Sequence, residues 1–151
     1  MRILAKITPL FALIFMAFSA HAQVRQMTPD EAYAKALAGE IVLIDIRTPE
    51  EWAETGVADV ALRNNLHASD FIPTLLTIRD QNPETPLALI CRSGSRSGYA
   101  TTQLYQAGLT NIVDVVEGMG GSGMGPGYIA RGLPMRASNA PVNPAISTVQ
   151  P

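Results

Sequence analysis

Short continuous runs of apolar residues recur along the chain, separated by segments with helical spacing. Three such runs cover 41–46, 86–91 and 112–116, and a weaker one covers 61–66. Short apolar runs bounded by turn residues are typical of strands that are buried on both faces of a parallel sheet. We therefore predict a strand at each of these positions.

The intervening segments carry the signals of helix starts and stops. Thr28 and Thr48 are each followed by a proline and two acidic residues, which suits an N-cap, a first helical turn and the positive end of a helix dipole. The expected helices cover 28–39, a short segment from 48, 69–82 with Ser69 and Asp70 as its cap, 99–107 and 128–130. Strands that alternate with helices predict an α/β domain with a mostly parallel sheet flanked by helices.

The first 22 residues have a different character from the rest of the chain. Arg2 and Lys6 flank the start of an apolar stretch over 7–18, and Ala20-His21-Ala22 has the small-x-small pattern that signal peptidase accepts. The stretch is short for a transmembrane helix. These features predict a secretory signal peptide over 1–22 and a periplasmic mature protein without stable membrane association. A signal retained as a membrane anchor is the alternative.

Composition sets the remaining boundaries. The 151 residues suffice for one domain, expected over 23–136, and the formal net charge of −2 gives no basic field that would attract nucleic acid. From 137 onward Pro, Ser and Asn dominate, which predicts a disordered tail over 137–151. We expect a monomer that acts on small molecules.

The chain has a single cysteine, Cys91. In an oxidising compartment cysteines are commonly paired, so an unpaired thiol is either a buried apolar residue or a reactive group. Cys91 is the last residue of the predicted strand 86–91. Because active sites of α/β folds lie at the C-terminal ends of strands, this position favours a reactive group.

The residues after Cys91 favour anion binding. A loop that leads from a strand into a helix can point successive N–H groups at one spot, where they bind an anion or a thiolate. Gly94 permits backbone dihedral angles that strain other residues. Arg92 and Arg96 add positive charge, which favours the thiolate and could bind an oxyanion such as thiosulfate.

This loop resembles the active-site loop of the rhodanese family, Cys-Arg-x-Gly-x-Arg, at Cys91, Arg92, Gly94 and Arg96. Residues 43–52 are similar to the family's Asp-x-Arg-x-x-x-Glu-aromatic signature, and 116–119 and 132–134 resemble the segments that close the domain. The resemblance spans roughly residues 26–136. It implies a rhodanese-like three-layer α/β domain.

The resemblance also implies a thiosulfate sulfurtransferase with a two-step reaction. The Cys91 thiolate would take the outer sulfur of a donor such as thiosulfate, and an acceptor, either cyanide or a thiol, would remove it from the Cys91 persulfide. The thiol would then be exposed and sensitive to oxidation. No metal or organic cofactor is implied. The residues expected to bind the substrate and persulfide are Arg92, Ser93, Gly94, Ser95, Arg96 and Ser97, with Asp45 and Arg47 as a supporting ion pair.

Alternatives remain at this stage. A cysteine phosphatase or arsenate reductase would carry Cys-x5-Arg, whereas Cys91 to Arg96 gives Cys-x4-Arg. A periplasmic persulfide carrier or a partner-binding module would use the same loop as an enzyme. The glycine-rich segment 118–127 is longer than the usual family pattern and leaves substrate choice open. We expect Trp52, Met119 and Met124 to pack in the interior and His67 to lie in a surface loop.

Overall fold

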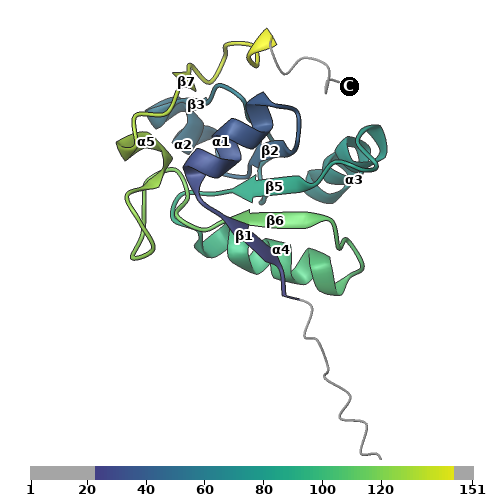
Figure 1. Ribbon diagram of the computed structural model, residues 1–151. Helices are drawn as coiled ribbons and strands as arrows, with labels where there is room; N and C mark the ends of the chain where they lie inside the picture. Colours follow the sequence, from purple (N-terminus) through teal and green to yellow (C-terminus); the bar gives the residue numbers. More distant parts are fainter. Residues whose placement is uncertain (1–22, 145–151) are drawn as a thin grey trace, which may run out of the picture.

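The computed structural model describes residues 23–144 (Figure 1). Its strands are β1 (Arg25–Met27), β2 (Val42–Asp45), β3 (Val57–Ala58), β4 (Leu62–Arg63), β5 (Leu87–Ile90), β6 (Ile112–Val115) and β7 (Met135–Arg136). Its helices are α1 (Pro29–Leu37), α2 (Pro49–Thr55), α3 (Phe71–Gln81), α4 (Ser95–Gln106) and α5 (Gly127–Ala130). The expected signal peptide, 1–22, lies outside the described residues.

The main sheet is parallel throughout and has the strand order β1-β6-β5-β2-β4. Strand β5 is central, between β2 and β6, with Ile90 opposite Asp45 and Leu89 opposite Asp114. A second, two-stranded sheet pairs β3 with β7 in the antiparallel direction. The predicted fold class, a mostly parallel sheet flanked by helices, is confirmed.

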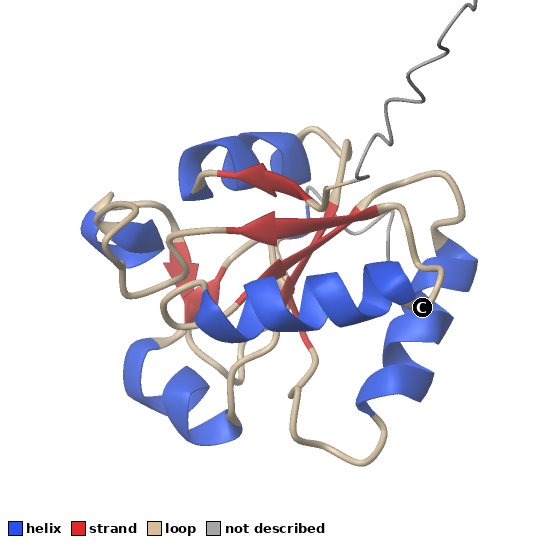
Figure 2. Cartoon of the chain, turned by 90° about the horizontal axis from the view of Figure 1, so that it is seen from below, coloured by secondary structure: helices blue, strands red, loops and turns tan. Residues whose placement is uncertain are grey.

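Two hydrophobic cores cover the two faces of the sheet, which Figure 2 shows between its helices. Leu43 and Ile90 point into the core that contains α1 and α2, whereas Ile44 and Leu89 point into the core that contains α3 and α4. Successive strand residues face opposite sides of a sheet. Strands with a core on each side must therefore be apolar at nearly every position, as the continuous runs predicted.

Two of the three predicted N-caps are formed in the structure. Thr28 and Thr48 each form a capping box with the glutamate three residues on, so their predicted role is confirmed. Asp70 precedes α3 but makes no side-chain capping bond. The helix predicted over 99–107 begins earlier, at Ser95, because the Ser- and Gly-rich residues that predict a loop form its first turn.

Part of the expected C-terminal tail lies against the domain. The backbone N–H of Asn143 donates to Asp59 O at 2.9 Å, and the Arg136 guanidinium donates to Ala140 O at 2.6 Å. These bonds hold residues 137–144 against the domain, although their composition predicted disorder. Residues 145–151 lie outside the described residues. No helix within 23–144 is both long and apolar enough to cross a membrane.

Candidate active site

Cys91 follows directly after β5 and is fully buried. The backbone N–H of Gly94 donates to its Sγ at 3.2 Å. The Ser97 hydroxyl lies 3.5 Å from Sγ and 3.2 Å from Gly94 O. The thiol is therefore covered by its own loop and not exposed as expected, but it has polar partners that an inert core thiol lacks.

The Cys91 loop and the start of α4 carry several backbone N–H groups without a backbone acceptor. Those of Arg92 and Ser93 have no acceptor among the described residues, and the first N–H groups of α4, which begins at Ser95, have none within the helix. The N-terminus of α4 also carries the positive end of the helix dipole. The loop can thus bind an anion held at the Cys91 sulfur.

Two glycines allow the loop to pack closely against the segment that follows β6. At Gly94 φ is +84°, and a Cβ there would lie 1.9 Å from Val116 O. At Gly118 φ is +69°, and a Cβ would lie 2.6 Å from the Arg92 backbone. No other residue type fits either position without moving the loop.

The glycine-rich segment 118–127 holds the Cys91 loop through backbone hydrogen bonds. Met119 N–H donates to Cys91 O at 2.8 Å, and Gly120 N–H donates to Arg92 O at 2.7 Å. These bonds hold the loop carbonyls in place and leave its N–H groups free. The segment whose role the sequence left open is therefore part of the scaffold of the site.

The buried Glu117 carboxylate anchors this segment. It accepts hydrogen bonds from Gly127 N–H at 2.9 Å and from the Arg131 guanidinium at 2.6 and 2.9 Å. Hydrogen bonds from Arg131 hold the pKa of Glu117 below its usual range. Arg131 also pairs with Asp30 of α1, so the segment is tied to the body of the domain.

Arg96 does not point freely toward a substrate. Its guanidinium donates to both carboxylate oxygens of Glu51, at 2.6 and 2.8 Å. These bonds lower the pKa of Glu51 to about 2. Glu51 also completes the capping box of α2 with Thr48. A single carboxylate therefore joins the start of α2 to the start of α4.

Asp45 and Arg47 form the supporting ion pair that the sequence predicted. Both are buried, and Arg47 Nη2 lies 2.7 Å from Asp45 Oδ2. The Arg47 guanidinium also donates to Thr55 Oγ1 and to Gly56 O, both at 2.8 Å. The pair thus fixes the C-terminal end of α2 to the end of β2. Because α2 also carries Glu51, the pair helps to position that carboxylate.

The exposed part of the loop holds the remaining predicted residues. Arg92, Ser93 and Ser95 are exposed, and the Arg92 guanidinium has no partner among the described residues. Of the two arginines assigned to substrate binding, Arg92 alone has an unpaired guanidinium. It is therefore the side chain best placed to contact an incoming anion.

Sequence reasoning missed two residues beside the site. Glu51 lies within the signature at residues 43–52, and its position there was the signal that could have identified it. Asp114 is buried beneath the start of α4, and burial raises its pKa, an effect opposed by hydrogen bonding from Ser97. A lone aspartate within the apolar run 112–116 was the signal for it.

The other expectations have mixed outcomes. Trp52 and Met119 are buried and His67 is exposed in a loop, as predicted. Met124 is 70% exposed, so its predicted packing is wrong. It lies at the tip of a tight turn closed by two backbone hydrogen bonds between Ser122 and Gly125, which projects it away from the core. Within 23–144 no group of three metal-ligating side chains is found.

Comparison with known proteins places the chain in a family. The model of the rhodanese-like domain matches residues 28–121, and the chain belongs to that family. It is 25% identical over 96 residues to the thiosulfate sulfurtransferase GlpE of Pseudomonas entomophila, covering 64% of this chain and 82% of that one.

Solved structures agree with this assignment. Rv0390 from M. tuberculosis is similar with a TM-score of 0.60 and 28% identity, covering 76% of this chain and 98% of that one. The polysulfide-sulfur transferase of Wolinella succinogenes is similar with a TM-score of 0.58 and 26% identity, and the match covers 75% of this chain and 78% of that one. The protein is thus a rhodanese-like domain with sulfurtransferases among its structural neighbours.

Proposed function

We propose that this protein is a sulfurtransferase that carries a sulfane sulfur on Cys91. The observation that carries the proposal is the position of the chain's one cysteine. It lies at the C-terminal end of the central strand, next to a loop whose Arg92 and Ser93 N–H groups have no acceptor within residues 23–144. Such donors stabilise a thiolate and the persulfide anion formed from it, without a metal or an organic cofactor.

In the first step the Cys91 thiolate attacks the outer sulfur of thiosulfate. A bond forms between Sγ and that sulfur, and the sulfur–sulfur bond of the donor breaks with its electron pair leaving on sulfite. The N–H groups of the loop, from Arg92 to Ser97, receive the charge on the transferred sulfur. The free guanidinium of Arg92 binds the oxyanion end of the donor.

In the second step a thiophilic acceptor attacks the outer sulfur of the persulfide. The electron pair of the breaking bond returns to Cys91 Sγ, which restores the thiolate. Cyanide as acceptor gives thiocyanate, and a small or protein thiol gives a new persulfide. In this step the acceptor needs to reach only the outer sulfur, whereas in the first step the donor must reach the covered Cys91 Sγ.

The loop length supports sulfur over phosphoryl transfer. Four residues separate Cys91 from Arg96, and Arg96 is held by Glu51 at 2.6 Å. A phosphatase of related architecture needs a longer loop whose arginine binds the phosphoryl oxygens. The names of the related transferases from Pseudomonas and Wolinella agree with sulfur chemistry.

The proposed setting is the periplasm, with residues 1–22 as a cleaved signal. The basic start, apolar stretch and Ala20-His21-Ala22 support export. We expect a monomer whose partners are a small sulfur donor and an acceptor. Burial suits an unpaired thiol in an oxidising compartment, because a covered Sγ is shielded from oxidation between turnovers.

Turnover from thiosulfate to cyanide tests the proposal, with thiocyanate as the measured product. We expect saturable turnover by the purified chain and none by Cys91→Ser, which removes the nucleophile. Persulfide formation without thiocyanate would identify a carrier or a partner-binding module instead. A folded protein with a free thiol that accepts no sulfur from thiosulfate would contradict the thiosulfate proposal.

A further inference from the structure

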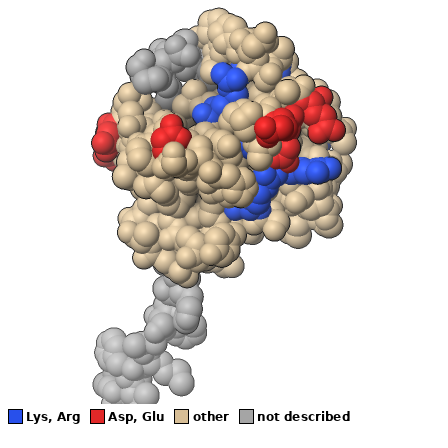
Figure 3. Space-filling model, turned by 180° about the vertical axis from the view of Figure 1, so that it is seen from behind, with Lys and Arg blue, Asp and Glu red and all other residues tan. Residues whose placement is uncertain are grey.

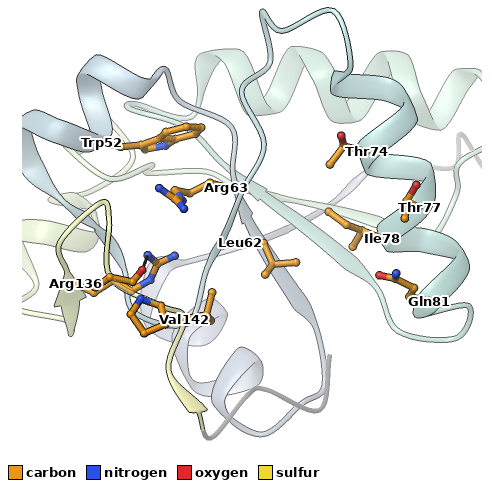
Figure 4. A pocket seen from close by; sticks show the side chains of 11 residues that line it. Trp52, Leu62, Arg63, Thr74, Thr77, Ile78, Gln81, Arg136 and Val142 are labelled. Atoms are coloured by element: carbon orange, nitrogen blue, oxygen red, sulfur yellow. Dashed lines mark hydrogen bonds between the residues drawn. The ribbon is translucent and has the colours of Figure 1, made fainter. Parts of the chain in front are cut away.

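A cavity that is separate from the Cys91 loop lies beside the edge strand β4 (Figure 4). Its volume is about 630 Å³, and none of residues 91–97 lines it. Its walls come from α2, β4, α3 and the C-terminal segment that folds back over the domain. Its size falls within the range of small-molecule sites.

Two arginines line one side of this cavity, and neither has a carboxylate partner. Arg63 donates to Ser138 O, and Arg136 donates to Ala140 O at 2.6 Å and to Ala61 O at 2.9 Å. Within 23–144 neither takes part in an ion pair. Burial, and next the charge of Arg63, lowers the pKa of Arg136. The two cations therefore repel each other across the cavity wall.

The acidic groups near these arginines do not neutralise both. Asp45 and Asp59 act on Arg136 from a distance, but neither lines the cavity. Asp45 is already paired with Arg47 at 2.7 Å. The lining includes two arginines and no carboxylate, so an excess of positive charge remains at the cavity. On the face seen from behind, basic side chains lie near the middle, and acidic ones lie beside them and toward both sides (Figure 3).

The remaining lining of the cavity is mostly apolar, with a few polar side chains. The Trp52 ring forms one wall, with the guanidinium carbon of Arg63 at 5.8 Å from its centroid, and Leu62 lies between this wall and α3. Across from the arginines, Thr74 and Gln81 make no side-chain hydrogen bond with any described residue (Figure 4). The cavity therefore offers an aromatic surface, two cations and unpaired hydrogen-bonding groups.

We propose that this cavity binds a small organic anion, with an aromatic or otherwise flat apolar body that carries a carboxylate or sulfonate. The apolar body contacts Trp52 and Leu62, and the anionic group lies between Arg63 and Arg136. A cation or an uncharged polar molecule would leave the arginines unpaired. The site is separate from Cys91 and does not depend on sulfur transfer.

The chain's single tryptophan makes the site directly observable, because Trp52 is the only source of indole fluorescence. The probe is 4-methylbenzenesulfonate, titrated into the full chain while Trp52 emission is recorded. The uncharged analogue 4-methylbenzyl alcohol serves as the matched ligand. We expect saturable binding of the sulfonate and roughly tenfold weaker binding of the alcohol, since the alcohol lacks the charge-assisted hydrogen bonds.

Variants locate the binding. Arg63→Gln and Thr74→Val should weaken binding of the sulfonate, Arg63→Gln by about tenfold because it removes one cation. Arg25→Gln, an exposed arginine outside the cavity, and Cys91→Ser should bind as the parent does. Calorimetric titration provides the same constants if Arg63→Gln alters the emission of Trp52. Equal affinity for the alcohol, equal affinity of Arg63→Gln, or no saturable binding would overturn the proposal.

Discussion

The Cys91 sulfur is buried, yet its surroundings differ from those of an apolar core position. Its closest polar contact is Gly94 N–H at 3.2 Å, and the Ser97 hydroxyl lies at 3.5 Å. Both contacts place a hydrogen-bond donor beside the sulfur. We propose that the N–H groups of Arg92 and Ser93, which have no acceptor among residues 23–144, bind the outer sulfur of the persulfide. Loading of Cys91 with sulfur therefore requires the donor to reach a covered Sγ, whereas unloading requires access to the outer sulfur alone.

Arg92 provides a test of donor binding at the residue scale. Because its guanidinium is exposed and unpartnered, Arg92→Gln should leave the free energy of unfolding within about 0.5 kcal/mol of the parent. It should raise KM for thiosulfate roughly tenfold through loss of a charge-assisted hydrogen bond. Steady-state kinetics and denaturant unfolding measure the two effects, with Arg25→Gln as control. An unchanged KM would show that Arg92 does not bind the donor.

Gly94 provides a test of the close packing behind the loop. Gly94→Ala places a Cβ 1.9 Å from Val116 O at a φ of +84°, so the loop must move. We expect a loss of about 2–4 kcal/mol of stability and loss of sulfur transfer. The matched control is Gly39→Ala, where φ is +72° but a Cβ would meet nothing within 4 Å. That variant should cost only about 1–2 kcal/mol. Equal destabilisation of the two would contradict the packing account.

At the scale of elements, α2 and α4 are joined through the Glu51–Arg96 ion pair, which lies between their N-termini. The buried Asp45–Arg47 pair holds the other end of α2. Together these contacts set the position of α4 relative to β5, and the first turn of α4 supplies the anion-binding N–H groups. The elements beside the site are thus positioned by charges, although apolar packing supplies the core.

Acid titration tests this connection. The folded pKa of Glu51 is about 2, below its unfolded value, so ionised Glu51 stabilises the fold above about pH 4.5. This contribution is lost as the pH falls toward 2. Glu51→Gln should lower stability at pH 7 by about 1–3 kcal/mol and flatten its pH dependence below pH 4.5. Glu54→Gln, in the same helix, is the control, and an identical acid profile for both variants would contradict the assignment.

The elements also show what the sequence could predict. Runs such as Val42–Asp45 and Leu87–Ile90 were recognisable because strands with a core on each side must be apolar throughout. The start of α4 was missed because Gly94, Ser95 and Ser97 are common in loops, and only a contact with Val116 distinguishes this turn. The Glu51–Arg96 pair joins positions 45 residues apart, which spacing along the chain does not predict.

At the scale of the whole molecule, the C-terminal segment completes the domain. Strand β7 pairs with β3, and Asn143 bonds to Asp59 through both its backbone and its side chain. Two-residue strands and a Pro-rich segment carry no periodic signal, so their placement depends on partners far away in the sequence. The same segment forms one wall of the cavity beside β4.

Truncation tests the contribution of this segment. A chain that ends after Arg136 loses the hydrogen bonds made by Ala140 and Asn143. Its stability should fall by about 1–2 kcal/mol, which lowers Tm by several degrees, roughly 4–8 °C per kcal/mol. A chain that ends after Pro144 keeps these bonds and should melt at a higher temperature than the chain that ends after Arg136. Equal melting of the two truncated chains, measured by circular dichroism, would show that 137–144 contributes nothing.

The central claim is covalent sulfur transfer at Cys91, and intact mass tests it most directly. After treatment with thiosulfate, the purified protein should gain the mass of one sulfur atom, and cyanide should remove it. Cys91→Ser should gain nothing under the same conditions. A parent protein with a free thiol and an unchanged mass would contradict the claim that thiosulfate loads this site.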